Sequence, residues 1–117
     1  MTVSRILICG GRDYTDAAQF ADTMAVAQKW FSQNCCIIEG GAKGADAMAR
    51  NWAKANGKPC LTIEPNWSVY GLRAGMVRNT WMLVYGLPDL VIAFPGGIGT
   101  ADMIRQTEKS KIALWRI

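Results

Sequence analysis

The chain has 117 residues, half of them hydrophobic, and a net charge of +4 with no histidine. This length fits one domain over residues 1–117, while the apolar content excludes an intrinsically disordered chain. The 13 basic residues are scattered without a Lys/Arg run, which disfavours nucleic-acid binding but suits a small anionic ligand.

Short apolar runs alternate with segments of helical periodicity along the chain. Thr15 or Asp16 is the expected N-cap of the first helix, and Gly57 is expected to end the second. The predicted elements, in chain order, are a strand at 5–9, a helix at 16–33, a strand at 35–39, a helix at 45–56, a strand at 60–63, an irregular segment at 64–72, a helix at 73–85, a strand at 90–94, a loop at 95–99, a helix at 100–110 and a strand at 112–115.

Strands that alternate with helices predict an α/β fold. We expect a Rossmann-like three-layer sandwich, in which four main helices cover both faces of a five-stranded parallel sheet. Right-handed crossovers leave few topologies, and the simplest strand order is 3-2-1-4-5. Winding then reverses between the first and fourth strands, and ligands of open α/β sheets bind at such a switch point, outside the carboxyl ends of the strands.

The cysteines and the apolar runs bear on the cellular compartment. Neither a CxxC pair nor histidine is present, so the usual zinc patterns are missing, and we expect no metal and no cofactor. The N-terminal apolar run does not match a signal peptide, and no run approaches the roughly 20 residues of a membrane span. We therefore expect a cytoplasmic protein without a membrane partner. Four structural thiols are predicted in or beside strands, namely Cys9, Cys35, Cys36 and Cys60.

Glycine-rich loops follow three predicted strands that are neighbours in the expected sheet. Glycine permits positive φ and close backbone approach, and each loop leads into a helix whose first N–H groups are unpaired. Three such loops at one edge predict a phosphate-binding site. PGGIGT at 95–100 is the sharpest of these motifs, and it is neither a Walker A loop nor the dinucleotide motif GxGxxG. The loops contain Gly10 and Gly11; Gly40, Gly41 and Gly44; and Gly96, Gly97 and Gly99.

Several polar side chains are candidates for ligand contact, each with a structural alternative. Arg12 and Lys43 lie within the loops, and Arg78 is either a phosphate-binding side chain or a surface arginine. Thr100 is expected both to cap its helix and to donate its hydroxyl, and Asp46 to stabilise a helix N-terminus or to bind a ligand hydroxyl. Trp67 and Tyr70 are candidates for stacking, for a lid or for an interface. The remaining candidates are Asp13, Asn79, Pro95 and Asp102.

Together these motifs resemble the SLOG superfamily over nearly the whole chain, and most of all its small YspA-like branch. The superfamily includes the DNA-processing protein DprA and the Lonely Guy (LOG) cytokinin-activating enzymes. The resemblance implies a Rossmann-like fold, frequent homodimers and binding of nucleotides or their derivatives. The matching segments are Gly10–Asp13, Gly40–Asp46, Trp67, Tyr70–Gly71, Ala74–Gly75, Arg78–Asn79, Met82 and Pro95–Met103.

The resemblance also bears on catalysis. LOG enzymes have the pattern PGGxGTxxE and use that Glu with an Arg to cleave base from ribose 5′-phosphate. Here Arg78 matches the Arg, but Met103 stands at the Glu position. Asp102 is one residue away and points about 100° apart on a helix. Glu39, at the end of the second strand, is a conceivable substitute. No residue is therefore assigned as catalytic.

The residues and the resemblance suggest three functions. The first is a non-catalytic binder of a nucleotide-like ligand. The resemblance implies that such a binder is a sensor or a phage-type sequestering protein for an ADP-ribose-like or cyclic nucleotide signal in immunity. The second is a hydrolase of N-glycosidic bonds that uses Asp102, Glu39 or Asp46 with Arg78 or Arg12. The third is DprA-like DNA binding, which the absence of a basic stripe disfavours.

Overall fold

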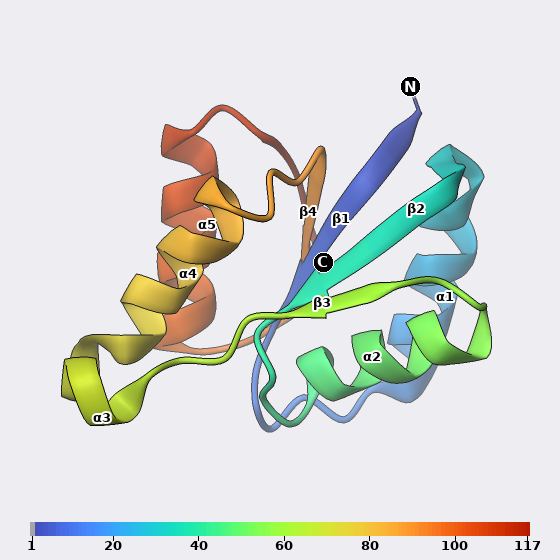
Figure 1. The fold of residues 1–117 in the computed structure, drawn as a ribbon. Helices are drawn as coiled ribbons and strands as arrows, with labels where there is room; N and C mark the ends of the chain where they lie inside the picture. Colours follow the sequence, from blue (N-terminus) through green and yellow to red (C-terminus); the bar gives the residue numbers. More distant parts are fainter. Residues whose placement is uncertain (1) are drawn as a thin grey trace.

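The computed structural model describes residues 2–117 (Figure 1). Alternating strands and helices run through the whole of this range. The elements in chain order are β1 (Val3–Cys9), α1 (Ala17–Ala27), the 3-10 helix η1 (Gln28–Trp30), β2 (Phe31–Glu39), α2 (Ala45–Ala55), β3 (Cys60–Thr62), α3 (Trp67–Tyr70), the 3-10 helix η2 (Gly71–Arg73), α4 (Ala74–Val84), β4 (Leu90–Ala93), α5 (Ile98–Lys109) and β5 (Ala113–Arg116).

The five strands form one sheet in the order β3-β2-β1-β4-β5, and every pairing is parallel. The predicted fold class and strand order are confirmed. In the register of the sheet, Ile8 of β1 pairs with Ile92 of β4, and Ile38 of β2 pairs with Leu61 of β3. The winding reverses between β1 and β4, so the loops that follow these strands open at the switch point.

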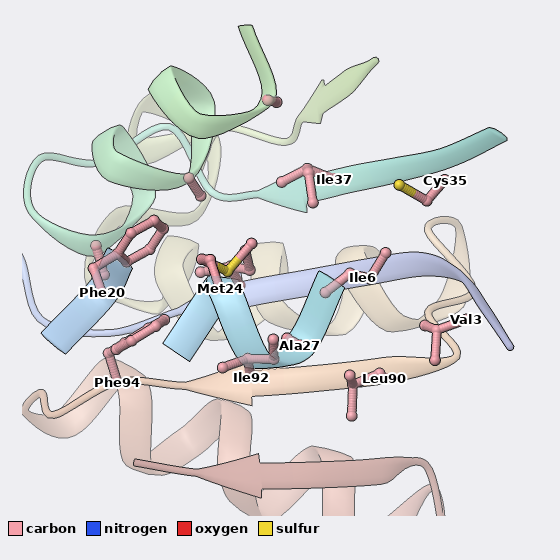
Figure 2. Packing of buried hydrophobic residues seen from close by; sticks show 14 of the residues in the cluster. Val3, Ile6, Phe20, Met24, Ala27, Cys35, Ile37, Leu90, Ile92 and Phe94 are labelled. Atoms are coloured by element: carbon pink, nitrogen blue, oxygen red, sulfur yellow. The ribbon is translucent and has the colours of Figure 1, made fainter. Parts of the chain in front are cut away.

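Helices cover both faces of the sheet, α1 and α2 on one side and α4 and α5 on the other (Figure 1). The alternation of side chains along β1 divides the core in two. Ile6 and Ile8 belong to the cluster under α1 and α2, while Leu7 and Cys9 belong to the cluster under α4 and α5. Figure 2 shows the first cluster, in which the ring of Phe20 stacks on Phe94 with 4.9 Å between ring centroids.

Two segments differ from the expectation. The first predicted helix was wrong at its end: α1 stops at Ala27, and β2 already begins at Phe31. Phe31 turns toward α2 and packs edge-on against Trp52, with 5.8 Å between ring centroids, and this contact favours the strand over a longer helix. The segment 64–72, expected to be irregular, contains the short helix α3, which the Asn66 side chain caps by accepting from the N–H of Val69 at 3.2 Å.

Helix ends follow the expected chemistry in two cases and not in a third. Asp16 caps α1 by accepting from the N–H of Gln19 at 2.9 Å, and Gly57 follows α2 with φ +64°. The expected cap at Thr100 was wrong, because α5 begins two residues earlier and its N-cap is Gly97. The four cysteines are free; Cys9 and Cys35 are buried, Cys36 is half-buried and Cys60 is exposed on the edge strand β3.

Candidate functional site

A cleft of about 1140 Å³ lies at the carboxyl edge of the sheet. The loops that follow β1, β2, β3 and β4 line it, together with one side of α4 and the first two turns of α5. We call it the carboxyl-edge cleft. The three glycine-rich loops therefore meet at one edge, as the strand order requires.

Close backbone packing joins these loops. The N–H of Gly11 donates to the carbonyl of Pro95 at 2.9 Å, and the N–H of Ala45 donates to the carbonyl of Gly11 at 3.2 Å. A Cβ built on Gly10 would lie 2.6 Å from the Cβ of Ala45, and one on Gly44 would lie 2.2 Å from the carbonyl oxygen of Gly11. Gly44 also has φ +68°, which favours glycine. These glycines are required by the contact between the loops.

Other glycines of the cleft have no such requirement. A Cβ built on Gly97 or Gly99 would meet nothing within 4 Å, and neither residue has a positive φ. Gly99 lies in the first turn of α5, where glycine is about 1 kcal/mol less favourable than alanine. A Cβ on Gly75, in the first turn of α4, would touch only the Trp67 ring at 3.9 Å. All three glycines line the cleft, so their bare backbone faces open space there.

Glu39 anchors the loop that follows β2. Its side chain is fully buried, and it accepts from Arg50 at 2.6 Å, from the N–H of Gly41 at 2.7 Å and from the hydroxyl of Thr62. Arg50 also donates to the carbonyl of Ala42 at 3.1 Å. Glu39 does not line the cleft, and its oxygens are occupied, so the structure gives it a structural role and not that of a substitute catalytic carboxylate.

A hydrogen-bonded chain connects α4 with α5. The Arg78 guanidinium donates to the carbonyl of Gly40 and, through Nε, to the Asn79 side chain at 3.1 Å. Asn79 is buried, and its Nδ2 donates to the carbonyl of Gly99 at 3.1 Å and to Asp102 at 3.0 Å. Arg78 is thereby held against the β2 loop, half-buried and facing the cleft.

Asp102, one of the predicted site residues, lies outside the cleft lining. It is buried and accepts from Asn79, from Arg105 at 2.7 Å and from Gln106 at 2.8 Å. Its helical phase turns it away from the cleft, and Met103, the next residue, lines the cleft instead with a fully buried side chain. The position at which LOG enzymes carry their Glu thus presents an apolar side chain.

Asp46 is the buried carboxylate of the cleft lining. It is 6% exposed and accepts from the N–H of Ala42 at 3.1 Å. Burial raises the pKa of Asp46, with opposition from that hydrogen bond and from the Arg78 charge, which favour the ionised form. Burial also raises the pKa of Cys9 at the cleft floor to about 12, so this thiol is neutral at physiological pH. Burial lowers the pKa of Arg78.

Most of the residues predicted for the site line the cleft, and three do not. Lys43 and Gly44, besides Asp102, lie outside the lining. Lys43 is exposed, and its direction could not be predicted because a loop has no periodicity. The predicted residues that line the cleft are Gly10, Gly11, Arg12, Asp13, Gly40, Gly41, Asp46, Trp67, Arg78, Asn79, Pro95, Gly96, Gly97, Gly99 and Thr100.

Sequence reasoning missed part of the lining. The β3–α3 loop contributes Glu64 and Pro65, and the segment before α1 contributes Tyr14. Tyr14 is nearly buried, packs on Phe94 with 5.3 Å between ring centroids and donates its hydroxyl to Gln19 at 2.7 Å. Glu64 directly follows the third predicted strand, and this position at a carboxyl end of the sheet was the available signal. The other missed residues are Cys9, Thr15, Asp16, Gln19, Ala42, Gly75, Met82, Ile98 and Met103.

Two comparisons with known proteins bear on this site. Residues 4–70 match the family described as YspA, cpYpsA-related SLOG, which is more than half of the chain. The chain belongs to this family. The Gene 61 protein of Mycobacterium phage D29 is 31% identical to it over 115 residues, covering 92% of this chain and 91% of the phage protein. Membership of the SLOG family suggests a nucleotide-related function, and the family match includes the two glycine-rich loops after β1 and β2.

Two further observations concern the part of the chain that the structure describes. Across residues 2–117, no three His, Cys, Asp or Glu side chains are grouped so that they could hold a metal ion. Within the same range, none of the helices has the length and apolar character needed to cross a bilayer.

Proposed function

We propose that the carboxyl-edge cleft binds a nucleotide or nucleotide-derived small molecule and that the protein holds this ligand without cleaving it. The observation that carries the proposal is Gly99. It lies in a helix, costs stability there and has open space where a side chain would stand, which supports close approach of a ligand to this backbone.

The start of α5 offers donors for a phosphate. The N–H groups of Ile98, Gly99 and Thr100 are the first of the helix and have no partner within it, because the first α-helical bond runs from Ala101 to Gly97 at 3.0 Å. The helix dipole adds positive potential at the same point. Arg78, which lines the cleft near the β2 loop, supplies a guanidinium for the same ligand.

Calorimetry with a panel of nucleoside monophosphates, NAD, ADP-ribose and cyclic ADP-ribose tests the proposal. We expect at least one of them to bind, and we expect Gly99→Val to weaken it at least about tenfold because the new side chain occupies the path to the N–H groups. Ala101→Val is the matched control, since Ala101 is exposed in the same turn but outside the cleft lining. Absence of binding by every compound, or equal loss in both variants, contradicts the proposal.

The finer identity of the ligand is also proposed. We infer an ADP-ribose-like or cyclic nucleotide signal, bound by a cytoplasmic sensor or by a phage-type sequestering protein in immune signalling. The similarity to a phage protein supports a phage setting. Tighter binding of ADP-ribose or its cyclic form than of AMP in the same panel is the expected result, and a preference for plain monophosphates contradicts it.

We further propose a homodimer or a higher homo-oligomer. Exposed apolar side chains on η2 and α4 support it: Leu72 is 98% exposed and Met76 50%. Light scattering is expected to give at least twice the mass of the 12.8 kDa chain, and a Leu72→Ser variant is expected to shift the mass toward the monomer. A monomeric wild-type protein at high concentration contradicts this.

A second candidate function, hydrolysis of an N-glycosidic bond, is favoured by Asp46. Of the three carboxylates considered, Asp46 lines the cleft, whereas Asp102 and Glu39 do not. Its raised pKa suits a group that donates a proton to a leaving base. Chromatography of AMP or NAD after incubation detects free base or nicotinamide. Activity that is lost in Asp46→Asn supports hydrolysis, and intact substrate at high protein concentration rejects it.

A further inference from the structure

One arm of the carboxyl-edge cleft lies between the β3–α3 loop and α4, which contribute Glu64, Pro65 and Gly75 to its lining. We propose that this arm binds the planar ring of the ligand by stacking on Trp67, so that the ligand must carry a nucleobase or similar aromatic ring. The inference rests on the proposed function, because it deepens the specificity of the same cleft.

Trp67 is placed as a platform. Of the five tryptophans, all of which lie within residues 2–117, Trp67 alone lines the cleft, and it remains 52% exposed. Its ring rests beside Gly75, since a Cβ built there would lie 3.9 Å from the indole. An exposed indole face offers a sequence-tolerant stacking surface for a nucleobase.

The helix that holds Trp67 is fixed to the fold by other residues. Tyr70, at the end of α3, packs edge-on against Trp81 of α4 with 5.6 Å between ring centroids. Asn66 caps α3 at its start. Trp67 is therefore not needed to anchor α3, and its exposed face is free for a ligand. This divides the two aromatic candidates: Tyr70 is a packing residue, and Trp67 faces the cleft.

The spacing along α4 fits a ligand that extends from this ring site to the phosphate site. Gly75, beside Trp67, and Asn79 are four residues apart and so share one face of the helix at ~6 Å separation. Asn79 is bonded to the carbonyl of Gly99 at 3.1 Å, at the start of α5. A base on Trp67 and a 5′-phosphate at the start of α5 would thus lie along the same side of α4, within the one cleft that both line.

The charge of this arm of the cleft sets the orientation of the ligand. Glu64 lines the cleft in the short loop before Asn66 and Trp67. Gly41, with φ +79°, leaves room for the Glu64 side chain. A carboxylate repels a phosphate and accepts hydrogen bonds from ring or exocyclic N–H groups. The ring is therefore favoured beside Trp67, and the phosphate at the N-terminus of α5.

Calorimetry that compares AMP, GMP, CMP and UMP with ribose 5-phosphate tests the inference. We expect the best monophosphate to bind at least about tenfold tighter than ribose 5-phosphate, since stacking of one base is of that order. Trp67→Ala is expected to abolish the difference and Trp67→Phe to retain most of it. Equal binding of the monophosphates and ribose 5-phosphate, or unchanged binding by Trp67→Ala, overturns the stacking site while the phosphate cleft stands.

Tryptophan fluorescence gives a second readout. The monophosphate that binds best is expected to quench the wild-type emission, and Trp67→Phe is expected to remove this quench. Trp30→Phe is the matched control, because Trp30 is 38% exposed on η1 and packs on Trp115 outside the cleft lining. A quench that survives Trp67→Phe overturns the stacking site. Absence of binding by all four monophosphates, by ribose 5-phosphate and by ADP-ribose overturns the proposed function and this inference together.

Discussion

The glycines at the carboxyl edge of the sheet fall into two groups that the sequence does not separate. Gly10, Gly44 and Gly96 sit where loops touch, and a Cβ on any of them would lie within 3.0 Å of another atom. Gly97 and Gly99 have open space in the same direction. Both groups belong to the glycine-rich loops that resemble a phosphate site.

The difference between the packed and the open glycines separates folding from binding. The packed glycines let the loops after β1, β2 and β4 come together, as the bond from Gly11 to Pro95 shows. The open glycines contribute nothing to that contact. A glycine-rich loop therefore combines two requirements, and substitutions at the two groups are expected to have opposite effects on stability and affinity.

The largest effect on stability is expected at a packed glycine. Gly44→Ala places a Cβ against the carbonyl of Gly11 and strains a residue with φ +68°, so we expect a loss of roughly 3 kcal/mol or more in the free energy of unfolding. Gly57→Ala isolates the strain, because Gly57 has φ +64° and nothing within 4 Å, and about 1 kcal/mol is expected there. Urea unfolding measures both. Equal losses in the two variants would mean that loop contact does not explain the packed group.

The anchor of the β2 loop ranks next. Arg50→Ala leaves Glu39 buried without its cation, and a loss of about 3 kcal/mol is expected. Arg105→Ala is the matched control, because Arg105 is 61% exposed in its ion pair and Asp102 keeps Asn79 and Gln106 as donors. Less than about 1 kcal/mol is expected there. A smaller loss in Arg50→Ala than in Arg105→Ala refutes the anchoring role of Glu39.

Asp46 lies two residues after the packed Gly44 and lines the cleft. Its pKa is raised by burial above the ordinary value of 3.8, so the folded state keeps a proton that the unfolded chain has already lost. Wild-type stability therefore falls as pH rises from 3.8 through the folded pKa. Asp46→Asn lacks this titration and is expected to gain stability relative to wild type over that window. Urea unfolding from pH 4 to pH 7 measures the difference, and parallel curves for the two proteins reject the effect.

The smallest effect on stability is expected at an open glycine. Gly99→Ala places a methyl group in the first turn of α5, where nothing obstructs it. The free energy of unfolding is therefore expected to stay unchanged or to rise by up to about 1 kcal/mol. Thermal unfolding measures it. A clear loss of stability would move Gly99 to the packed group and remove the observation on which the proposed function depends.

The fold was predictable because its periodicities are local. The strand–helix alternation and the right-handed crossovers were enough for the order β3-β2-β1-β4-β5. The end of the first helix was not, because Phe31 continues the apolar spacing of a helix, while its pairing with Val3 of β1 and its contact with Trp52 of α2 place it in β2.

The site was predictable in its loops and less so in its side chains. The strand order brings the glycines together, but the direction of Lys43 and the partners of Asp102 depend on tertiary contacts. The division between packed and open glycines depends on contacts between residues distant in sequence, such as Gly11 and Gly44. The spacing of glycines along the chain therefore does not predict it.

Nuclear magnetic resonance of the amide N–H groups tests the central claim most directly. The chain is titrated with AMP, NAD and ADP-ribose, and shifts are followed at the start of α5 and, for comparison, along β5 (Ala113–Arg116). We predict large shifts for the N–H groups of Ile98, Gly99 and Thr100, and small shifts in β5. Saturable shifts that leave the start of α5 unchanged, or no shifts with any of the three compounds, would contradict the claim that the open glycines receive the ligand.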